Sequence, residues 1–265
     1  MHSQPIVLTI AGSDNTGGAG IQADIKTCCA FGVYAASAIT GVTAQNSCGV
    51  YGVEPVSLNL LRLQIDSIFE VMRPDAIKTG MLPSPEIISL VAQKISEYNI
   101  QNVVVDPVMV ATNGDNLVTP GDETLLEFRN SLLPLATIVT PNLAEASAFM
   151  AKDVSEMNPL SICERLLNLF KSKSILLKGG HSSGNRSIDY LFDGFNFYEF
   201  NEEKVNTQNL HGTGCVLSSA IACGLAKGQN LLQSVEHGKQ FVTNAIKKAS
   251  RLKIIDGPGP LDLFN

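Results

Sequence analysis

The chain has 265 residues, of which 45% are hydrophobic and 17% are charged, so it carries ample material for a buried core. Its formal net charge of −6 argues against nucleic acid as a partner, because binding to a phosphate backbone needs clustered lysine and arginine. No apolar run is long enough to span a bilayer, and the first residues lack the regions of a signal peptide. The six cysteines show no zinc-site spacing. We therefore expect a cytoplasmic protein with free thiols and no membrane partner.

The first half of the chain alternates strand-like and helix-like segments. Residues 6–11 form a continuous apolar run, typical of a strand buried on both faces, and a glycine-rich loop follows at residues 12–20. This loop lacks the spacing of a P-loop, so on its own a flexible turn is an equally good interpretation. We expect a helix from residue 21, strands at 37–45, 75–82 and 103–105, helices at 58–72 and 85–98, and an extended segment at 49–56.

The second half continues this alternation. Apolar periodicity predicts helices at 121–132, 143–150, 159–170, 215–226 and 230–252, with strands at 136–140 and 174–178. Asp193-Gly194 lies between two strand-like runs, at 188–192 and 195–200, and this pattern is typical of a β-hairpin. No repeat or linker interrupts the chain. We therefore expect a single α/β domain over residues 1–265, with a mostly parallel sheet and an antiparallel edge hairpin.

The segment His211-Gly212-Thr213-Gly214-Cys215 comes directly before an apolar, helix-forming run. The first N–H groups of a helix lack internal partners and lie at the positive end of its dipole, so a glycine turn there can hold an anion. Cys215 in that first turn is expected to have a lowered thiol pKa. A tight loop before a core helix, with a structural cysteine, remains an alternative for this segment alone.

Most predicted strands end in small or polar residues, which would meet at one edge of a parallel sheet, where ligands bind. Carboxylate and amide oxygens suit Mg²⁺, and a lysine suits a phosphate as a point charge. Together with an anion-binding turn and a thiol able to accept a hydroxyl proton, this set favours phosphoryl transfer. The residues in question are Gly12, Ser13 and Asp14; Gln45 and Asn46; Lys78, Thr79 and Gly80; Asp106; Asn142 and Glu145; and Lys178, Gly179 and Gly180.

Eight short motifs, taken together and in this order, resemble the hydroxymethylpyrimidine/phosphomethylpyrimidine kinases of thiamine biosynthesis, within the ribokinase-like superfamily. The resemblance covers nearly the whole chain. It implies a three-layer α/β/α sandwich and ATP-dependent phosphorylation of 4-amino-5-hydroxymethyl-2-methylpyrimidine to its monophosphate and then its diphosphate. The motifs lie at residues 8–14, 17–24, 43–46, 78–82, 106–109, 140–145, 178–181 and 211–215.

The resemblance also implies roles for individual residues. The pyrimidine would lie near Gly12, Ala19, Asp24, Val42, Gln45, Met81 and Val108, with Gln45 on the edge of its ring. Asn142, Glu145, Lys178 and Thr213 would surround ATP, and Asp106 and Glu145 would hold Mg²⁺. Gly212, Thr213 and Gly214 would form the anion hole beside the catalytic Lys178, and Cys215 would be the base that takes the hydroxymethyl proton. A homodimer is implied, and the need for a monovalent cation is left open.

Two positions depart from the family pattern, because Leu210 and Val216 each stand where a threonine is usual. Each departure removes a hydroxyl beside the expected anion hole, and a neutral hydrogen bond contributes about 0.5–1.5 kcal/mol. A pyridoxal or pyridoxine kinase of the same subfamily is the nearest alternative, although residues 110–113 lack the lid cysteine often found in those enzymes. We expect residues 111–115 to form a mobile lid that excludes water.

Two other classes of function fit the sequence less well. A thiol hydrolase would pair Cys215 with His181 or His211, but His211 is too close in sequence to act as a separately placed base, and no third member is evident. A non-catalytic binding protein should lack the metal carboxylates and the base, whereas Asp106, Glu145 and Cys215 are all present.

Overall fold

A computed structural model describes residues 4–109, 122–179, 185–254 and 257–264. In these ranges the strands form one nine-stranded sheet of order β3-β2-β1-β4-β5-β6-β7-β8-β9. The pairs from β2 through β1, β4, β5 and β6 to β7 are parallel, whereas β2–β3, β7–β8 and β8–β9 are antiparallel. The strands are β1 (Ile6–Asp14), β2 (Tyr34–Asn46), β3 (Gly49–Pro55), β4 (Ala76–Thr79), β5 (Val103–Val105), β6 (Ile138–Val139), β7 (Ile175–Leu177), β8 (Arg186–Phe192) and β9 (Phe197–Glu203).

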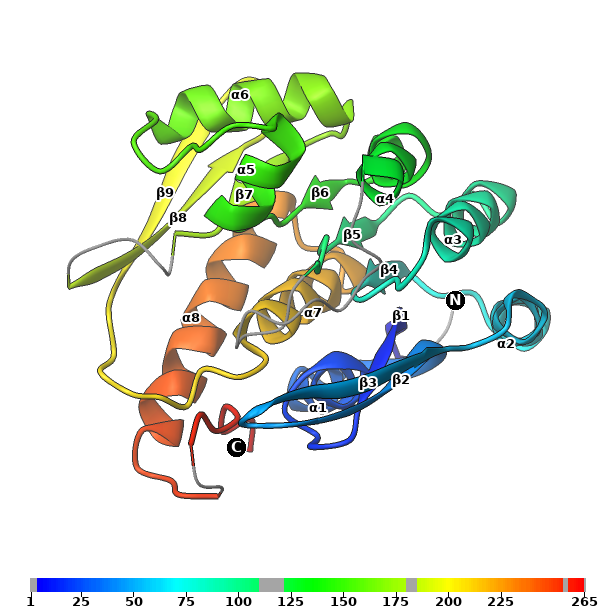
Figure 1. Ribbon diagram of the computed structural model, residues 1–265, viewed down its shortest axis with the longest axis horizontal. Helices are drawn as coiled ribbons and strands as arrows, with labels where there is room; N and C mark the ends of the chain where they lie inside the picture. The colour runs from blue at the N-terminus through cyan, green and yellow to red at the C-terminus, as the bar shows by residue number, and fades with distance from the viewer. Residues whose placement is uncertain (1–3, 110–121, 180–184, 255–256, 265) are drawn as a thin grey trace.

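Helices cover both faces of this sheet (Figure 1). One face carries α2 (Leu58–Val71), α3 (Pro85–Glu97), α4 (Asp122–Glu127), α5 (Leu143–Met150) and α6 (Pro159–Phe170). The other carries α1 (Gly20–Ala30), α7 (Thr213–Ala226) and α8 (Leu231–Ala249). The predicted three-layer α/β/α arrangement, with a mostly parallel sheet and an antiparallel edge hairpin, is confirmed.

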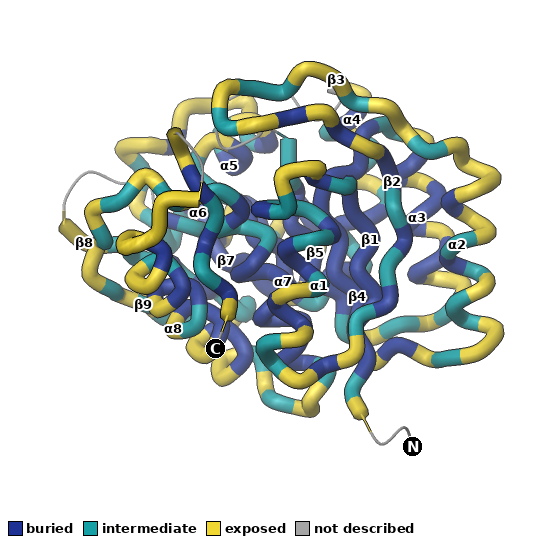
Figure 2. The backbone as a smooth tube through the Cα atoms, turned by 90° about the horizontal axis from the view of Figure 1, so that it is seen from below, coloured by how far each residue is buried: buried dark blue, intermediate teal, exposed yellow. Residues whose placement is uncertain are grey.

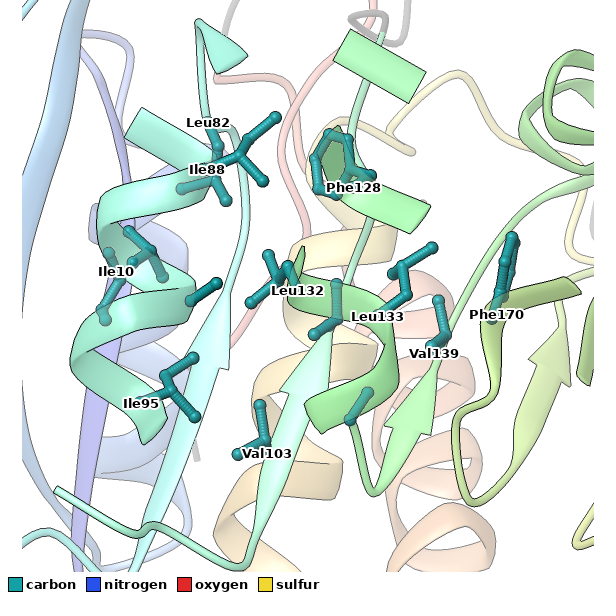
Figure 3. Close-up of a cluster of buried hydrophobic side chains, with 14 of the residues drawn as sticks. Ile10, Leu82, Ile88, Ile95, Val103, Phe128, Leu132, Leu133, Val139 and Phe170 are labelled. Carbon is teal, nitrogen blue, oxygen red and sulfur yellow. The ribbon is translucent and has the colours of Figure 1, made fainter. Parts of the chain in front are cut away.

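The two layers of helices enclose two separate apolar cores, because side chains alternate across a strand. In β5, Val103 and Val105 point into the core under α2 to α6, and Val104 points into the core under α1, α7 and α8. Figure 3 shows the first core, where Phe128 and Phe170 lie among aliphatic side chains. Figure 2 shows that β1, β4, β5 and α7 run through the buried centre of the molecule, whereas much of α2 and β3 is exposed.

Local signals explain where several elements begin. α3 starts as predicted, with the Ser84 hydroxyl accepting the N–H of Ile87 and Pro85 in the first turn. The structure differs from the single helix expected at 121–132. The α-helical part, α4, ends at Glu127 and is followed by a π-helical turn at Phe128–Leu132 and a 3₁₀ turn at Leu133–Leu135. The first and last residues of the wider, π-helical turn, Phe128 and Leu132, are both buried in the core. The extended segment expected at 49–56 is β3, which pairs with β2 as a second antiparallel edge that the sequence did not reveal.

No helix in the described part of the chain combines the length and the apolar character needed to cross a membrane.

Phe170→Ala tests the packing of the first core. The Phe170 ring is fully buried and packs edge-on against Phe149, with the ring centroids 4.7 Å apart. We expect the free energy of unfolding to fall by about 3–5 kcal/mol, because the deletion leaves a cavity. Urea unfolding followed by circular dichroism measures this loss. Phe195→Ala is the matched control: the Phe195 side chain is 93% exposed, and a change within about 0.5 kcal/mol is expected. Equal losses in the two variants would contradict the assignment of Phe170 to the core.

Candidate active site

The carboxyl ends of the central parallel strands meet the N-terminus of α7, which packs against β1, β4 and β5 (Figure 1). This edge is where ligands bind in open α/β sheets. Four polar side chains reach it from different strands: Asp14 ends β1, Asp106 follows β5, Asn142 follows β6, and Lys178 follows β7. The topology therefore gathers at one edge residues that lie far apart in the sequence.

Gly212 caps α7 in the left-handed region, at φ 85°, and no side chain caps this end of the helix. A Cβ at Gly212 would overlap the carbonyl oxygen of Gly18, so the turn and the first glycine loop meet backbone to backbone. The exposed end of the helix dipole is suited to an anion. Thr213 turns its hydroxyl back to the carbonyl of Leu210, at 2.7 Å. Val216, which stands where a threonine is usual, is fully buried in the core beneath α7.

Asp106 and Lys178 form an ion pair directly beside this turn. Their Oδ1 and Nζ atoms are 2.7 Å apart, and a Cβ built on Gly214 would lie 3.3 Å from Lys178 Nζ and 3.4 Å from Asp106 Oδ2. Burial lowers the pKa of Lys178, but the charges of Asp106 and Glu145 outweigh it and raise that pKa, so the ammonium stays charged. Gly214 therefore lies directly against a fixed cation and a carboxylate, next to the N–H groups that begin α7.

Asn142 and Glu145 cap α5 reciprocally. Asn142 Oδ1 accepts the N–H of Glu145, and Glu145 Oε2 accepts the N–H of Asn142, each at 2.8 Å. Glu145 Oε2 also lies 4.0 Å from Lys178 Nζ. Burial raises the pKa of Glu145 to about 7, against the opposing charge of Lys178. The first turn of α5 thus presents an amide and a titratable carboxyl group to the site.

The expected Mg²⁺ ligands, Asp106 and Glu145, lie on either side of Lys178. Within the described ranges no group of three or more histidine, cysteine or acidic side chains is placed to hold a metal ion. Mg²⁺ commonly takes only one or two carboxylates and fills its other positions with water and substrate phosphates. The two carboxyl groups fit that kind of site, in which phosphate oxygens would supply the remaining ligands.

Asp24, which was expected near the pyrimidine, is completely buried. Its oxygens accept hydrogen bonds from Thr9 Oγ1 at 2.5 Å and Ser219 Oγ at 2.7 Å, and both lie 2.8 Å from Lys78 Nζ. Asp24 therefore holds Lys78 instead of facing open space. Sequence reasoning noted Lys78 only as a strand-end residue and missed this pair; a lysine after the apolar Ala76 and Ile77 was the one signal available.

The expected lowering of the Cys215 pKa is wrong for the protein without ligands. Burial raises the pKa of the Cys215 thiol to about 11. The charge of Lys78 lowers it, and the charges of Asp24 and Asp106 raise it. The position at a helix N-terminus was visible in the sequence, but the surrounding protein and the two carboxylates were not. The resting side chain is therefore a neutral thiol.

His211 ties the turn before α7 to the first glycine loop. Its Nε2 atom lies 2.8 Å from Asp14 Oδ2, which also accepts the N–H of Ala19 at 2.8 Å. Burial raises the pKa of Asp14, but hydrogen bonds from His211, Gln45 and Thr16 outweigh it and hold that pKa well below its usual range. Sequence analysis considered His211 only as a hydrolase base and missed this structural bond.

Ala19 lies in this loop, and three other residues expected around the pyrimidine, Met81, Val42 and Gln45, lie near it with different exposures. Met81 is buried, and a Cβ on Gly12 would overlap its terminal methyl group. Val42 pairs with Ser13 in the sheet and is 51% exposed. Gln45 is buried, whereas Ala19 and Val108 are partly buried. The lid expected at 111–115 lies outside the described residues.

Comparisons with known proteins agree with this arrangement. The phosphomethylpyrimidine kinase family model matches residues 14–262. The hydroxymethylpyrimidine/phosphomethylpyrimidine kinase of Rhizobium meliloti (strain 1021) is 43% identical, over 98% of this chain and 97% of that protein. The chloroplastic thiamine biosynthetic bifunctional enzyme of Arabidopsis thaliana is 44% identical over 98% of this chain but 50% of its own length, so the chain spans about half of such longer relatives.

Among solved structures, an ADP complex of Bacillus subtilis pyridoxal kinase has a TM-score of 0.88 and 36% sequence identity, covering 98% of this chain and 97% of that chain. The family match extends from the end of β1 to beyond α8, and so includes the glycine turn and the strand ends that form the site. The chain therefore belongs to the phosphomethylpyrimidine kinase family, as its motifs predicted.

Proposed function

We propose that this chain transfers the γ-phosphoryl group of ATP to the hydroxymethyl oxygen of 4-amino-5-hydroxymethyl-2-methylpyrimidine, and then phosphorylates the monophosphate to the diphosphate. The observation that carries the proposal is the ion pair of Lys178 and Asp106 lying against Gly214 at the N-terminus of α7, with Cys215 next along the helix. Family membership supports the pyrimidine as substrate. The whole chain would act as one kinase domain.

In this proposal the donor phosphates lie between the first turns of α5 and α7. The N–H of Gly214 and the ammonium of Lys178 would hold the transferred phosphoryl group, and the N–H of Thr213, which donates to the carbonyl of Leu210 at 3.2 Å, would join them once that bond opens. Asn142 and Glu145 would face the nucleotide, and Asp106 and Glu145 would hold Mg²⁺. Mg²⁺ bound there would offset the charge of the phosphates. The ADP bound to the related Bacillus subtilis pyridoxal kinase supports a nucleotide donor.

Cys215 would act as the base in the first phosphorylation only. The resting thiol gives its proton to water, and the thiolate then accepts the hydroxymethyl proton while that oxygen bonds to the γ-phosphorus. The bond between the γ-phosphorus and the bridging oxygen breaks, which releases ADP and leaves Cys215 as the neutral resting thiol, so that the proton given to water at the start is the one proton released in the cycle. In the second phosphorylation the acceptor is an anionic phosphate monoester, which has little need of a base.

Three further features belong to the same proposal. Six free cysteines support a reducing, cytoplasmic location. Apolar side chains exposed on the β2–β3 ribbon, Val42 and Tyr51, support a homodimer. A monovalent cation stays an open addition to the nucleotide site. Pyridoxal kinase activity is the alternative function, favoured by the likeness to the Bacillus subtilis enzyme.

The substrate assignment is tested by following ADP release with Mg²⁺ and ATP. We expect turnover with the hydroxymethylpyrimidine and with its monophosphate, and kcat/KM for pyridoxal at least about tenfold lower, because a pocket built to hydrogen-bond one ring discriminates against another. EDTA in excess should abolish turnover, because the phosphates lose their counter-charge. Higher kcat/KM for pyridoxal would favour the alternative, and ADP release that is independent of any acceptor would contradict both.

Cys215→Ala tests the base. We expect kcat for the hydroxymethylpyrimidine to fall by about 10²–10⁴, the range for loss of a general base, and phosphorylation of the monophosphate to change by only a few-fold. ATP binding, measured by calorimetry, should be retained. Cys29→Ala is the matched control, because Cys29 is exposed and lies outside the site. Unchanged turnover of the hydroxymethylpyrimidine by Cys215→Ala would remove the proposed base.

Gly214→Ala tests the phosphoryl position. The added methyl group would lie 3.3 Å from Lys178 Nζ and 3.4 Å from Asp106 Oδ2, so it would press on the two groups that are proposed to hold the transferred phosphoryl group and its Mg²⁺. We expect kcat to fall by about 10²-fold or more for both phosphorylations, with little change in stability, because alanine favours a helix. In Gly52→Ala, the control, the new methyl group meets no atom within 4 Å. Wild-type kcat in Gly214→Ala would place phosphoryl transfer elsewhere.

A further inference from the structure

Lys78 is a completely buried charge to which the proposed function gives no task. Its side chain is 0% exposed, and its ion-pair partner Asp24 is equally buried. Desolvating two charges costs several kcal/mol per ion, and an apolar pair of similar volume often gives a more stable protein. Stability is therefore a poor explanation for a lysine at this position, and its surroundings point to a role in the site.

The ammonium of Lys78 is fixed below the first turn of α7. Both oxygens of Asp24 lie 2.8 Å from Lys78 Nζ, and Ser219 Oγ donates to Asp24 Oδ1 at 2.7 Å. Ser219 is four residues after Cys215, so the two side chains share one face of the helix. A Cβ on Gly80 would lie 2.9 Å from Lys78 Nζ, so a glycine makes room for the ammonium at the end of β4.

Four charged groups, each from a different element, act on Cys215. The Lys78 charge from β4 favours its thiolate, whereas the carboxylates of Asp24 on α1 and Asp106 after β5 oppose it. The reverse effect also holds, because a thiolate at Cys215 favours the charged forms of both Lys78 and Lys178. Lys178, however, is 2.7 Å from Asp106 and 4.0 Å from a second carboxylate, and it is needed at the phosphoryl group. Of these two lysines, Lys78 is therefore the one available to stabilise the thiolate of Cys215.

We propose that Lys78 is a positioning residue that stabilises the thiolate of Cys215 during phosphorylation, and that Asp24 and Ser219 hold its ammonium in place against α7. The inference rests on the proposed role of Cys215 as base. It also gives a function to the buried Asp24, which has no oxygen left to offer a pyrimidine. The N–H of Gly20 donates to the same sulfur and assists the thiolate.

Alkylation of Cys215 by iodoacetamide tests this coupling without reference to activity, because only the thiolate reacts. The exposed Cys29 and Cys48 are first replaced by serine, and modification of Cys215 is followed by mass spectrometry across a pH series. In Lys78→Met we expect the profile to move upward by about one pH unit or more, which is about tenfold slower alkylation at a given pH below the transition. In Asp24→Asn, which removes the opposing carboxylate, the profile should move downward.

The opposite signs separate electrostatics from a structural role, since mere loosening of the site would move both profiles in the same direction. Lys94→Met is the matched control: Lys94 on α3 is also buried and lies 2.7 Å from a carboxylate, that of Asp66 on α2, in the layer of helices on the opposite face of the sheet from α7. Its profile should equal that of the parent, and Lys78→Arg should recover most of the shift. If Lys78→Met does not fold, the test rests on Asp24→Asn alone. An alkylation profile of Asp24→Asn whose midpoint pH equals or exceeds that of the parent then overturns the inference.

The same variants carry the inference to the reaction. The acid limb of kcat/KM for the hydroxymethylpyrimidine should move with the alkylation profile, upward in Lys78→Met and downward in Asp24→Asn. If the alkylation profiles of Lys78→Met and Asp24→Asn equal that of the parent, the role of Lys78 is overturned, whatever the activity of Cys215→Ala. Full activity of Cys215→Ala would instead overturn the proposed base and leave the measured coupling between Lys78 and the sulfur in place. The two failures are therefore distinguishable.

Discussion

The contact between the turn before α7 and the first glycine loop is the constraint on which the site depends. Gly212 approaches the backbone of Gly18 so closely that any side chain would collide, and His211 bonds to Asp14 across the same junction. An N-terminal loop and a turn near the end of the chain therefore form one continuous surface. The N-terminal end of α7, where the donor phosphates are proposed to bind, is thereby held beside the loop proposed to receive the acceptor.

Two buried ion pairs, Asp106–Lys178 and Asp24–Lys78, lie along the first turns of α7. A serine hydroxyl of the helix contacts the carboxylate of each pair. Ser218 Oγ lies 3.3 Å from Asp106 Oδ2, in the pair with Lys178, and Ser219 Oγ bonds to Asp24 at 2.7 Å, in the pair with Lys78. Consecutive residues on a helix point about 100° apart, so two adjacent hydroxyls can serve two clusters. An otherwise apolar helix thus fixes both carboxylates and carries the sulfur one turn earlier.

Helices and strands that are set by neighbouring residues in the sequence could be predicted. The pairing of the charged residues in the site could not. The apolar run of β5 and the cap of α3 are local patterns, and the structure follows them. Lys78 and His211 instead bond to partners 54 and 197 residues away, which no local pattern encodes. The predicted direction of the Cys215 pKa shift was wrong for the same reason, because the groups that bury the thiol and the carboxylates near it come from segments distant in sequence.

The choice of a thiol as the proposed base follows from this crowding of charge. Asp24 and Asp106 already act electrostatically on Cys215, and each carboxylate has one lysine to compensate it. An aspartate at residue 215 would be a third buried carboxylate without a cation of its own, which is costly in a low dielectric. A thiol avoids this cost because it is neutral at rest. In the proposed reaction its charge is needed only while the acceptor loses its proton, when the ammonium of Lys78 would favour the thiolate.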